Sequence, residues 1–334
     1  MSLPLALSKR SCPPSWQRCS GGQYQLFRRY LLVTECKNKI RVGKPKWLRR
    51  TLPTGPEYEK IRRLLKNHSL TTVCQEAKCP NQFECYGEGT ATFMILGEKC
   101  TRNCRFCAVG HPPESLPDPE EPERVAEAVV LLKLRYAVIT SVTRDDLEDG
   151  GAALFVETIE AIRSKSPDTL IEVLIPDLQG NWAALAKIVE AGPDVLNHNV
   201  ETISRLYPQV RPQAIYSRSL ALLKKVKEIA PQMVTKSGLM VGLGETVEEL
   251  TQTWKDILGS ATDILTIGQY LQPSVSHLEV QRYVPPEEFD QYAELALEHG
   301  FPGVASGVFV RSSYHAESLY KKATRALNKK NGSL

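Results

Sequence analysis

Six of the nine cysteines of this 334-residue chain lie between positions 74 and 107. They form two triplets, Cys74-x4-Cys79-x5-Cys85 and Cys100-x3-Cys104-x2-Cys107. Thiolates are soft ligands that suit iron–sulfur clusters or zinc. Because each triplet is one ligand short of four, the pattern indicates two iron–sulfur clusters whose fourth irons are held by other groups. An iron left open by the protein can bind a substrate or a cofactor.

Zinc and disulfide bonds are the two other common uses of many cysteines. A four-cysteine zinc site usually pairs two short Cys-x2–4-Cys hooks across a spacer, and the two triplets do not follow that pattern. Disulfides are dense in small secreted domains, whereas this chain is long and shows no secretory signal segment. We therefore favour iron–sulfur clusters, with zinc as the alternative.

The second triplet has Phe106 between its last two cysteines, and this loop resembles that of the radical S-adenosylmethionine (SAM) enzymes. In that family the loop holds a [4Fe–4S] cluster, SAM chelates the fourth iron, and electron transfer cleaves SAM to a 5′-deoxyadenosyl radical. The resemblance implies that Cys100, Cys104 and Cys107 hold such a cluster. The protein then positions the cofactors, which carry out the difficult chemistry.

Composition places the chain among globular proteins. With 42% hydrophobic residues it can bury one large core or two modest ones. No apolar run is long enough to span a bilayer, so we expect no membrane partner. Residues 1–50 carry a net charge of +11, and because the whole chain carries +4, the remaining residues carry −7. That acidic body argues against nucleic-acid binding, which needs clustered positive charge.

Residues 1–43 form a basic N-terminal extension, which we expect to be disordered or a targeting segment. The extension is rich in Arg and Lys and holds one acidic residue, Glu35, as in organellar transit peptides. Pro13-Pro14 and Gly21-Gly22 interrupt any long amphipathic helix, so a disordered tail or an over-extended start site fits equally well. We assign no ligand role to the three cysteines of this extension, Cys12, Cys19 and Cys36.

The rest of the chain divides into three segments. Residues 44–90 hold a basic stretch, a helix at Tyr58–Lys66 and the first triplet; residues 91–285 hold the second triplet and alternating strands and helices; residues 286–334 hold a final helix and a polar loop. The expected strands are Phe93–Leu96, Ala137–Val142, Leu170–Ile175, Asp194–Asn197, Met233–Val241 and Asp263–Ile267. The expected helices between them are Glu123–Leu134, Ala152–Lys165, Trp182–Glu190, Tyr216–Ile229 and Val247–Leu258.

This alternation favours a parallel sheet built from βα units. Six units close only part of an eight-stranded barrel and leave a lateral opening for a bulky substrate. We therefore predict an α/β fold, a partial (β/α)6 TIM-like radical SAM barrel, with its chemistry at the carboxyl ends of the strands. A doubly wound open sheet is the alternative, because alternation alone does not separate the two folds.

Polar residues follow several of the predicted strands. Ser141–Asp146 follows the second strand, Asn197–Glu201 follows the fourth, and Lys236 lies within the fifth. A SAM site needs hydrogen-bond acceptors, backbone donors and a few charges. We predict that the residues that contact SAM are Phe106, Ser141, Asn197, Glu201, Arg211 and Lys236.

Each of these motifs also has a purely structural interpretation. Asp145-Asp146 fits a helix cap before Gly150-Gly151, and His198 fits a buried core histidine. Gly242–Glu245 fits a turn before a helix capped by Thr246, because it lacks the G-x-G-x-x-G spacing of a nucleotide site.

Near the C-terminus, residues 311–316 read Arg-Ser-Ser-Tyr-His-Ala and follow the glycine-bearing stretch Gly303–Gly307. With the two triplets, this motif makes the chain closely similar to the lipoyl synthase family of radical SAM enzymes. The resemblance covers roughly Lys44 to Ser318 and includes Ser-Val-Thr-Arg-Asp-Asp-Leu, Asn-His-Asn-Val-Glu-Thr and Gly-Gln-Tyr-Leu-Gln-Pro. It departs at Thr143, where the family more often has Asp, which bears on the SAM contacts and not on the chemistry.

The resemblance implies that Cys74, Cys79 and Cys85 hold an auxiliary [4Fe–4S] cluster, with Ser313 as its fourth protein ligand. Serine is an unusual, hard ligand for iron, and an alkoxide should leave more readily than a thiolate once it is protonated. This fits a cluster that is consumed as a sulfur donor. Both clusters must then face one cavity, so we expect the serine loop to fold back over the barrel mouth, close to the first triplet.

The implied reaction inserts two sulfurs, at C6 and C8, into an octanoyl chain on a lysine of a lipoyl carrier domain. The implied partners are octanoylated carrier domains, namely 2-oxoacid dehydrogenase E2 subunits and the glycine cleavage H protein. An electron donor such as ferredoxin or flavodoxin is also implied, together with an iron–sulfur carrier that rebuilds the auxiliary cluster.

Two rival functions are compatible with the cysteines alone. A biotin synthase-like enzyme would insert sulfur into a free small molecule, but the first triplet and the Arg-Ser-Ser-Tyr motif count against it. A ferredoxin-like electron carrier could hold two clusters in one segment, yet it needs no barrel. Because oxygen destroys clusters with an open iron, we expect a reducing compartment. That is the cytoplasm, or a plastid or mitochondrion if residues 1–43 are a transit peptide.

Overall fold

The computed structural model describes residues 45–49, 56–87, 92–113 and 115–332, which belong to one compact unit, 44–334. The basic extension at residues 1–43, with Cys12, Cys19 and Cys36, lies outside the described residues.

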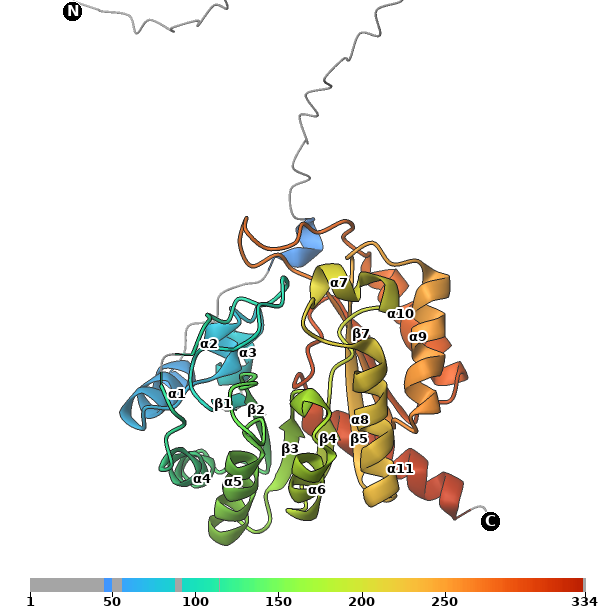
Figure 1. The fold of residues 1–334 in the computed structure, drawn as a ribbon. Helices are drawn as coiled ribbons and strands as arrows, with labels where there is room; N and C mark the ends of the chain where they lie inside the picture. Colours follow the sequence, from blue (N-terminus) through green and yellow to red (C-terminus); the bar gives the residue numbers. More distant parts are fainter. Residues whose placement is uncertain (1–44, 50–55, 88–91, 114, 333–334) are drawn as a thin grey trace, which may run out of the picture. The chain divides into compact units, whose positions relative to one another are not determined.

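The core of this unit is a sheet of seven parallel strands in sequential order, so β1 and β7 are its two edges (Figure 1). The strands are β1 (Thr92–Ile95), β2 (Tyr136–Ser141), β3 (Leu170–Leu174), β4 (Val195–Asn197), β5 (Val234–Val241), β6 (Ile264–Gln269) and β7 (Gly303–Gly307). The predicted α/β fold with a parallel sheet of βα units is confirmed, and each of the six predicted strands lies within two residues of its expected bounds. The seventh strand, β7, was not predicted, because its sequence Gly-Val-Ala-Ser-Gly is poor in the residues that favour strands.

Helices connect the strands and pack beside one another along the sheet, α4 on α5, α5 on α6, α6 on α8 and α8 on α9. The longer helices after the second triplet are α4 (Glu121–Leu131), α5 (Ala152–Lys165), α6 (Trp182–Glu190), α8 (Tyr216–Ile229), α9 (Val247–Gly259), α10 (Pro286–Glu298) and α11 (Ala316–Asn331). The short helical segments are η1 (Lys46–Leu48), α2 (Val73–Glu76), α3 (Gln82–Gly87), η2 (Leu178–Gly180), η3 (Ser204–Leu206) and α7 (Tyr207–Val210), and the first long helix is α1 (Pro56–Asn67).

Local sequence explains where these elements begin and end. The predicted cap of α9 is confirmed, because Glu249 N donates to Thr246 Oγ1 at 3.3 Å and Thr246 N donates to Glu249 Oε2 at 2.9 Å. This reciprocal pair satisfies two backbone donors that the first turn of a helix leaves free. The side chains of Leu250, Trp254 and Ile257 recur at helical spacing and are buried.

Helix α11 covers the amino end of the sheet. Its Leu319 and Ala323 pack against Val195, Val234 and Ile264, the first residues of β4, β5 and β6. Figure 1 shows α11, in red, crossing beneath these strands. The opposite, carboxyl end of the sheet is therefore where loops can gather into a site, as in other βα barrels.

The first cysteine triplet lies beside the β1 edge of the sheet. Thr72 forms an antiparallel bridge with Phe93, and Met94 N donates to Thr71 O at 2.9 Å. Ile61 and Leu65 of α1 are buried in the same apolar cluster as the strand residues. The segment of α2 and α3, which carries Cys74 and Cys85 in its helices and Cys79 between them, is therefore attached to the edge strand.

Candidate functional site

The second cysteine triplet lies in the loop after β1, and backbone hydrogen bonds fix this loop. Cys100 N donates to Gly110 O at 2.8 Å, which joins the two ends of the loop. Thr101 donates to Thr143 O twice, from N and from Oγ1, at 2.9 Å in each case. The loop is thus closed on itself and attached to the segment that follows β2.

Arg102 attaches the same loop to two further segments through a buried ionic network. Its guanidinium donates to Asp145 Oδ2 at 2.6 Å and Oδ1 at 2.9 Å, and to Asp177 Oδ1 at 2.6 Å. Burial opposes ionisation of Asp177, but the hydrogen bond from Arg102 outweighs it and lowers the pKa of Asp177 to about 2. Asp177 is therefore a carboxylate at neutral pH, as the network requires.

The three thiols of this loop come together. Cys104 and Cys107 both interact electrostatically with Cys100, and Cys100 Sγ accepts hydrogen bonds from the backbone N of Arg102 (3.4 Å) and of Thr143 (3.3 Å). Burial raises the pKa of Cys107 to about 12 and raises that of Cys104. Because ligation needs thiolates, metal binding at this loop must release protons.

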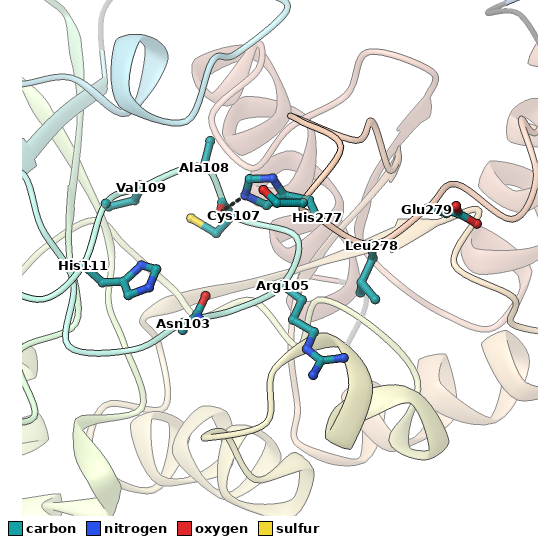
Figure 2. Close-up of a pocket in the computed structure, with 11 residues that line it drawn as sticks. Asn103, Arg105, Cys107, Ala108, Val109, His111, His277, Leu278 and Glu279 are labelled. Atoms are coloured by element: carbon teal, nitrogen blue, oxygen red, sulfur yellow. Dashed lines mark hydrogen bonds between the residues drawn. The ribbon is translucent and has the colours of Figure 1, made fainter. Parts of the chain in front are cut away.

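His277 contacts the loop from its outer side. Its Nε2 lies 2.8 Å from the carbonyl oxygen of Cys107, and its Nδ1 lies 2.8 Å from Ser274 Oγ. Figure 2 shows the imidazole beside Cys107. Both residues line a hollow of about 750 Å³, together with Arg105 and His111. Cys107 therefore borders a space at the surface of the cysteine loop.

Polar side chains gather at the carboxyl ends of the strands, as predicted. Ser141 ends β2, Asn197 ends β4, and Glu201 and Arg211 lie in the segments after β4. Ten buried side-chain atoms have no hydrogen-bond partner among the residues that the structure describes, and four of them lie in this region: Ser141 Oγ, Asn197 Oδ1, Asn199 Oδ1 and Arg211 Nε. Buried polar groups are normally paired, so these atoms fit a site that receives a polar ligand such as SAM.

Glu201 and Arg211 lie near the cysteine loop. Both interact electrostatically with Cys104, and Arg211 Nη1 donates to Asn199 O at 2.9 Å. Burial raises the pKa of Glu201, with Arg211 opposing that shift. Phe106 is partly buried and packs against the apolar cluster of β5 and β6. The structure therefore brings five of the six predicted SAM contacts toward one end of the sheet.

Lys236 lies opposite Asn197 in the strand register and forms a buried ion pair. Its Nζ donates to Glu172 Oε1 at 2.9 Å and Oε2 at 3.1 Å, and both side chains are 1% exposed. Glu172 also accepts from Asn197 Nδ2 and from the hydroxyl of Tyr136, the first residue of β2. In this structure Lys236 thus belongs to a satisfied ion pair inside the sheet.

The structural interpretations of two motifs are confirmed. His198 is buried between Ile175 O and Ser219 Oγ, and burial lowers its pKa to about 4, so it is a neutral core histidine. Gly242–Glu245 is a turn between β5 and α9. The helix α5 is capped by Asp149 instead of Asp145, because Asp149 accepts from Gly151 N and Ala153 N.

The thiols of the first triplet also lie close to one another. Cys74 is buried and interacts electrostatically with Cys79 and Cys85, and burial raises the pKa of Cys74 to about 12. Three thiols that interact with one another are donors of the soft type that an iron–sulfur cluster takes. No group of three or more His, Cys, Asp or Glu side chains among the described residues is arranged around a single metal ion.

The polar loop after β7 reaches the first triplet. Tyr314, which follows Ser313, donates from its hydroxyl to Glu84 Oε1 at 2.8 Å, and Glu84 precedes Cys85. Asn81 Nδ2 donates to Phe309 O at 2.7 Å. The contacts agree with the expectation that the serine loop folds back, while the role of Ser313 as a ligand stays a prediction.

Sequence reasoning missed four residues of this site: Arg102, Asp177, Glu84 and His277. Arg102 lies between two cysteines of the second triplet, and Glu84 directly precedes Cys85 of the first, so position in the sequence could have indicated both. Asp177 and His277 carry no comparable sequence signal.

The departure at Thr143 has a structural explanation. Its contacts to the cysteine loop are made by its backbone, through N to Cys100 Sγ and through O to Thr101. Any residue supplies those backbone groups, so replacement of Asp by Thr leaves the loop attachment intact.

Two family models match the chain. That of the Radical SAM superfamily matches residues 94–257, and that of the N-terminal domain of lipoyl synthase of the Radical SAM family matches residues 28–79. A lipoyl synthase from Desulfotalea psychrophila is 69% identical over 288 residues, which are 86% of this chain and 96% of that protein. A lipoyl synthase from Alkaliphilus metalliredigens is 55% identical over 279 residues, 84% of this chain and 96% of that protein.

Among solved structures, the [FeFe]-hydrogenase maturase HydG is similar with a TM-score of 0.53 and 14% identity, over 69% of this chain and 54% of that one. Streptococcus suis SuiB bound to SAM is similar with a TM-score of 0.50 and 10% identity, over 66% of this chain and 51% of that one. These likenesses show the fold. Within the described part of the chain, no helix combines the length and the apolar character needed to cross a membrane.

Proposed function

The chain belongs to the lipoyl synthase family of radical SAM enzymes, and we propose that its two cysteine triplets hold two [4Fe–4S] clusters with different tasks. The enzyme inserts sulfur at C6 and C8 of a protein-bound octanoyl-lysine. Those carbons carry no acidic proton, so a general base cannot activate them. A SAM-bound cluster supplies the radical chemistry that this reaction needs.

We assign Cys100, Cys104 and Cys107 as the ligands of the SAM-bound cluster. The loop that carries them is held by Thr143, by the Arg102 network and by His277. A loop fixed at several points holds its ligands in one geometry, which is what a preorganised site requires. The contribution of the protein at this site is therefore to orient the three cysteine ligands.

For SAM itself we propose contacts from Phe106, Ser141, Asn197, Glu201 and Arg211. The support is that Ser141, Asn197 and Arg211 each have a buried polar atom without a hydrogen-bond partner among the described residues. Glu201 and Arg211 offer opposite charges next to Cys104, which matches a ligand that carries an amino group and a carboxylate. We leave Lys236 out of this set, because its ammonium already pairs with Glu172 inside the sheet.

For the auxiliary cluster we assign Cys74, Cys79, Cys85 and Ser313, and we propose that this cluster donates the sulfur. The support is the hydrogen bond between Tyr314 and Glu84, which brings neighbours of Ser313 and Cys85 together although 230 residues separate them. Three thiolates and one serine oxygen give four ligands, the number that a [4Fe–4S] cluster takes.

The proposed partners follow from the reaction. The substrate is an octanoylated lipoyl carrier domain, such as a 2-oxoacid dehydrogenase E2 subunit or the glycine cleavage H protein. Reductive SAM cleavage needs an electron donor such as ferredoxin or flavodoxin, and a consumed cluster needs an iron–sulfur carrier to rebuild it. We propose the cytoplasm as the compartment, or a plastid or mitochondrion if residues 1–43 are a transit peptide.

The observation that carries this proposal is the presence of both triplets and the serine motif in a chain 69% identical to a lipoyl synthase. The test incubates reconstituted protein with SAM, a reductant and an octanoylated lipoyl-domain peptide. Mass spectrometry should find two added sulfurs, and the protein should hold about eight irons per chain. Deoxyadenosine without any thiolated peptide would instead indicate another radical SAM substrate.

Three triple variants separate the tasks of the cysteines. C100A/C104A/C107A should lose deoxyadenosine formation and keep about four irons, whereas C74A/C79A/C85A should keep deoxyadenosine formation and about four irons but make no thiolated peptide. C12A/C19A/C36A is the matched control and should retain about eight irons and full product. Thiolated peptide from C74A/C79A/C85A would contradict the donor assignment.

A further inference from the structure

We propose that Glu84 and Tyr314 are positioning residues that hold Ser313 against the first cysteine triplet, independently of the cluster bound there. This latch would let the auxiliary site be rebuilt after its sulfur has been removed. The inference rests on the proposed role of Ser313 and assigns a function to two residues beside the proposed ligands.

The latch consists of two hydrogen bonds between segments far apart in the chain. Tyr314 hydroxyl donates to Glu84 Oε1 at 2.8 Å, and Asn81 Nδ2 donates to Phe309 O at 2.7 Å. Asn81 is 1% exposed, and its own carbonyl accepts from Cys85 N at 2.9 Å. One residue therefore begins the helix that carries Cys85 and also reaches the serine loop.

These bonds join the two edges of the open sheet. The segment with Glu84 is attached to β1, and the loop with Tyr314 follows β7 directly. Because β1 and β7 are not paired with each other, no strand ladder fixes the distance between them. Side-chain contacts such as these therefore contribute to the position of the loop relative to the first triplet.

The serine loop has further anchors on its other side. Tyr314 N donates to Arg311 O at 3.0 Å, which makes Ser313 part of a tight turn. Ser312 Oγ accepts from Asn199 Nδ2 at 2.7 Å. A Cβ on Gly268 would collide with the carbonyl oxygen of Val310, so the loop lies directly against β6. The hydrogen bond from Tyr314 to Glu84 anchors the side of the loop that faces the first triplet.

The chemistry of the ligands explains why such a latch is useful. A serine oxygen is a hard ligand, and iron–sulfur clusters are held mainly by thiolates. Once the cluster loses sulfur, the iron–oxygen bond cannot be what keeps the loop in place. A hydrogen bond between two protein groups does not depend on iron, and it keeps Ser313 at high effective concentration beside the three thiols.

The test compares Y314F, E84A and E84Q with the wild-type chain and with Y320F, a control for loss of a tyrosine hydroxyl on the adjacent helix α11. Each full-length reconstituted protein turns over once, then receives iron and sulfide, and its iron content is followed with time. We expect Y314F and E84A to regain auxiliary iron about tenfold more slowly, the factor that corresponds to one charge-assisted hydrogen bond. E84Q keeps an acceptor oxygen but loses the charge, so it should rebuild at a rate between those of E84A and wild type. Y320F should rebuild at the wild-type rate.

A second measurement needs no activity and no loaded cluster. Hydrogen exchange of residues 308–315 should be faster in Y314F and E84A than in wild type, and the double variant Y314F/E84A should be no faster than either single variant. Equal exchange in wild type and Y314F would overturn the latch, and so would unchanged rebuilding in a variant whose exchange is faster.

The two proposals can fail separately. If the wild-type protein loses no iron during turnover, the auxiliary cluster is not the sulfur donor, and the proposed function fails at that point. The latch proposal is then tested by hydrogen exchange alone, because that measurement does not involve the cluster.

Discussion

Arg102 Nη2 donates a 2.6 Å hydrogen bond to Asp177 Oδ1, although 75 residues separate the two. Their side chains are 3% and 0% exposed. Arg102 lies between the proposed ligands Cys100 and Cys104, and Asp177 lies just after β3. The pair therefore ties the cluster loop to the carboxyl end of the sheet, and it should matter for both stability and cluster binding.

Replacement of Arg102 should be strongly destabilising. R102Q leaves the buried carboxylate of Asp177 without its main partner, and breaking a buried ion pair in this way costs about 3 kcal/mol or more. Urea unfolding at pH 7 measures the change in the free energy of unfolding. R105Q removes an exposed arginine of the same loop and should change the free energy of unfolding by less than about 0.5 kcal/mol. Equal losses in both variants would contradict the role of the network.

The pH dependence of this effect follows from the lowered pKa of Asp177. That pKa is about 2 in the folded protein, against about 3.9 in an unfolded chain. A carboxyl group with a lowered pKa stabilises the fold above its unfolded pKa and loses that contribution as the pH falls through the folded value. The deficit of R102Q should therefore be constant above about pH 5 and should shrink as the pH falls from about 4 toward about 2. Urea unfolding of both proteins across that range measures the change, and a deficit that does not shrink would contradict the role of Asp177.

Variants of the buried pair Lys236–Glu172 distinguish two roles for Lys236, which are pairing with Glu172 and direct contact with SAM. K236M should cost about 3 kcal/mol of unfolding free energy, because Glu172 stays buried and charged, whereas K236M/E172Q should recover most of that loss. Isothermal titration with SAM then distinguishes the roles. If Lys236 acts only through the pair, the double variant binds SAM as wild type does. Tenfold weaker binding in the double variant would identify Lys236 as a direct SAM contact.

Gly238 is expected to tolerate no side chain. A Cβ there would lie 2.7 Å from Thr266 Oγ1 and 2.8 Å from Asn199 Oδ1, and Asn199 holds the Ser312 hydroxyl. G238A should therefore lower the unfolding free energy by about 1 to 3 kcal/mol and weaken SAM binding. G259A is the matched control, because nothing lies within 4 Å of a Cβ at Gly259. Wild-type SAM affinity in G238A would show that Asn199 does not shape the SAM site.

Ser313 should be needed for sulfur insertion and not for SAM cleavage. S313A removes the proposed oxygen ligand while the three thiolates of the first triplet remain. We expect deoxyadenosine formation near the wild-type level, with thiolated peptide reduced at least about tenfold, as for loss of one positioned group. S318A, which changes an exposed serine whose hydroxyl donates to His315 O, should leave both products unchanged. Normal peptide thiolation by S313A would remove Ser313 from the ligand set.

The chemistry of this protein could be predicted from sequence because its ligands are local. Each cysteine triplet lies within a dozen residues, so covalent connectivity alone keeps its thiols close, and spacing indicates the kind of cluster. The strands could be predicted for a similar reason, because a parallel strand such as β6, buried over all six residues, is a short apolar run. Strand β7 escaped prediction because its sequence, Gly-Val-Ala-Ser-Gly, holds only one residue that favours strands.

Tertiary structure decided which distant residues meet. Lys236 resembles a ligand-binding lysine in sequence, yet the register of β3, β4 and β5 brings it to Glu172, 64 residues away. Asp177 and His277 reach the cysteine loop from the segments after β3 and β6, and Tyr314 reaches Glu84 across 230 residues. Spacing along the chain specifies contacts only over a few residues. Contacts over longer separations depend on how the sheet orders its strands and joins its two edges, and that order emerges only in the folded protein.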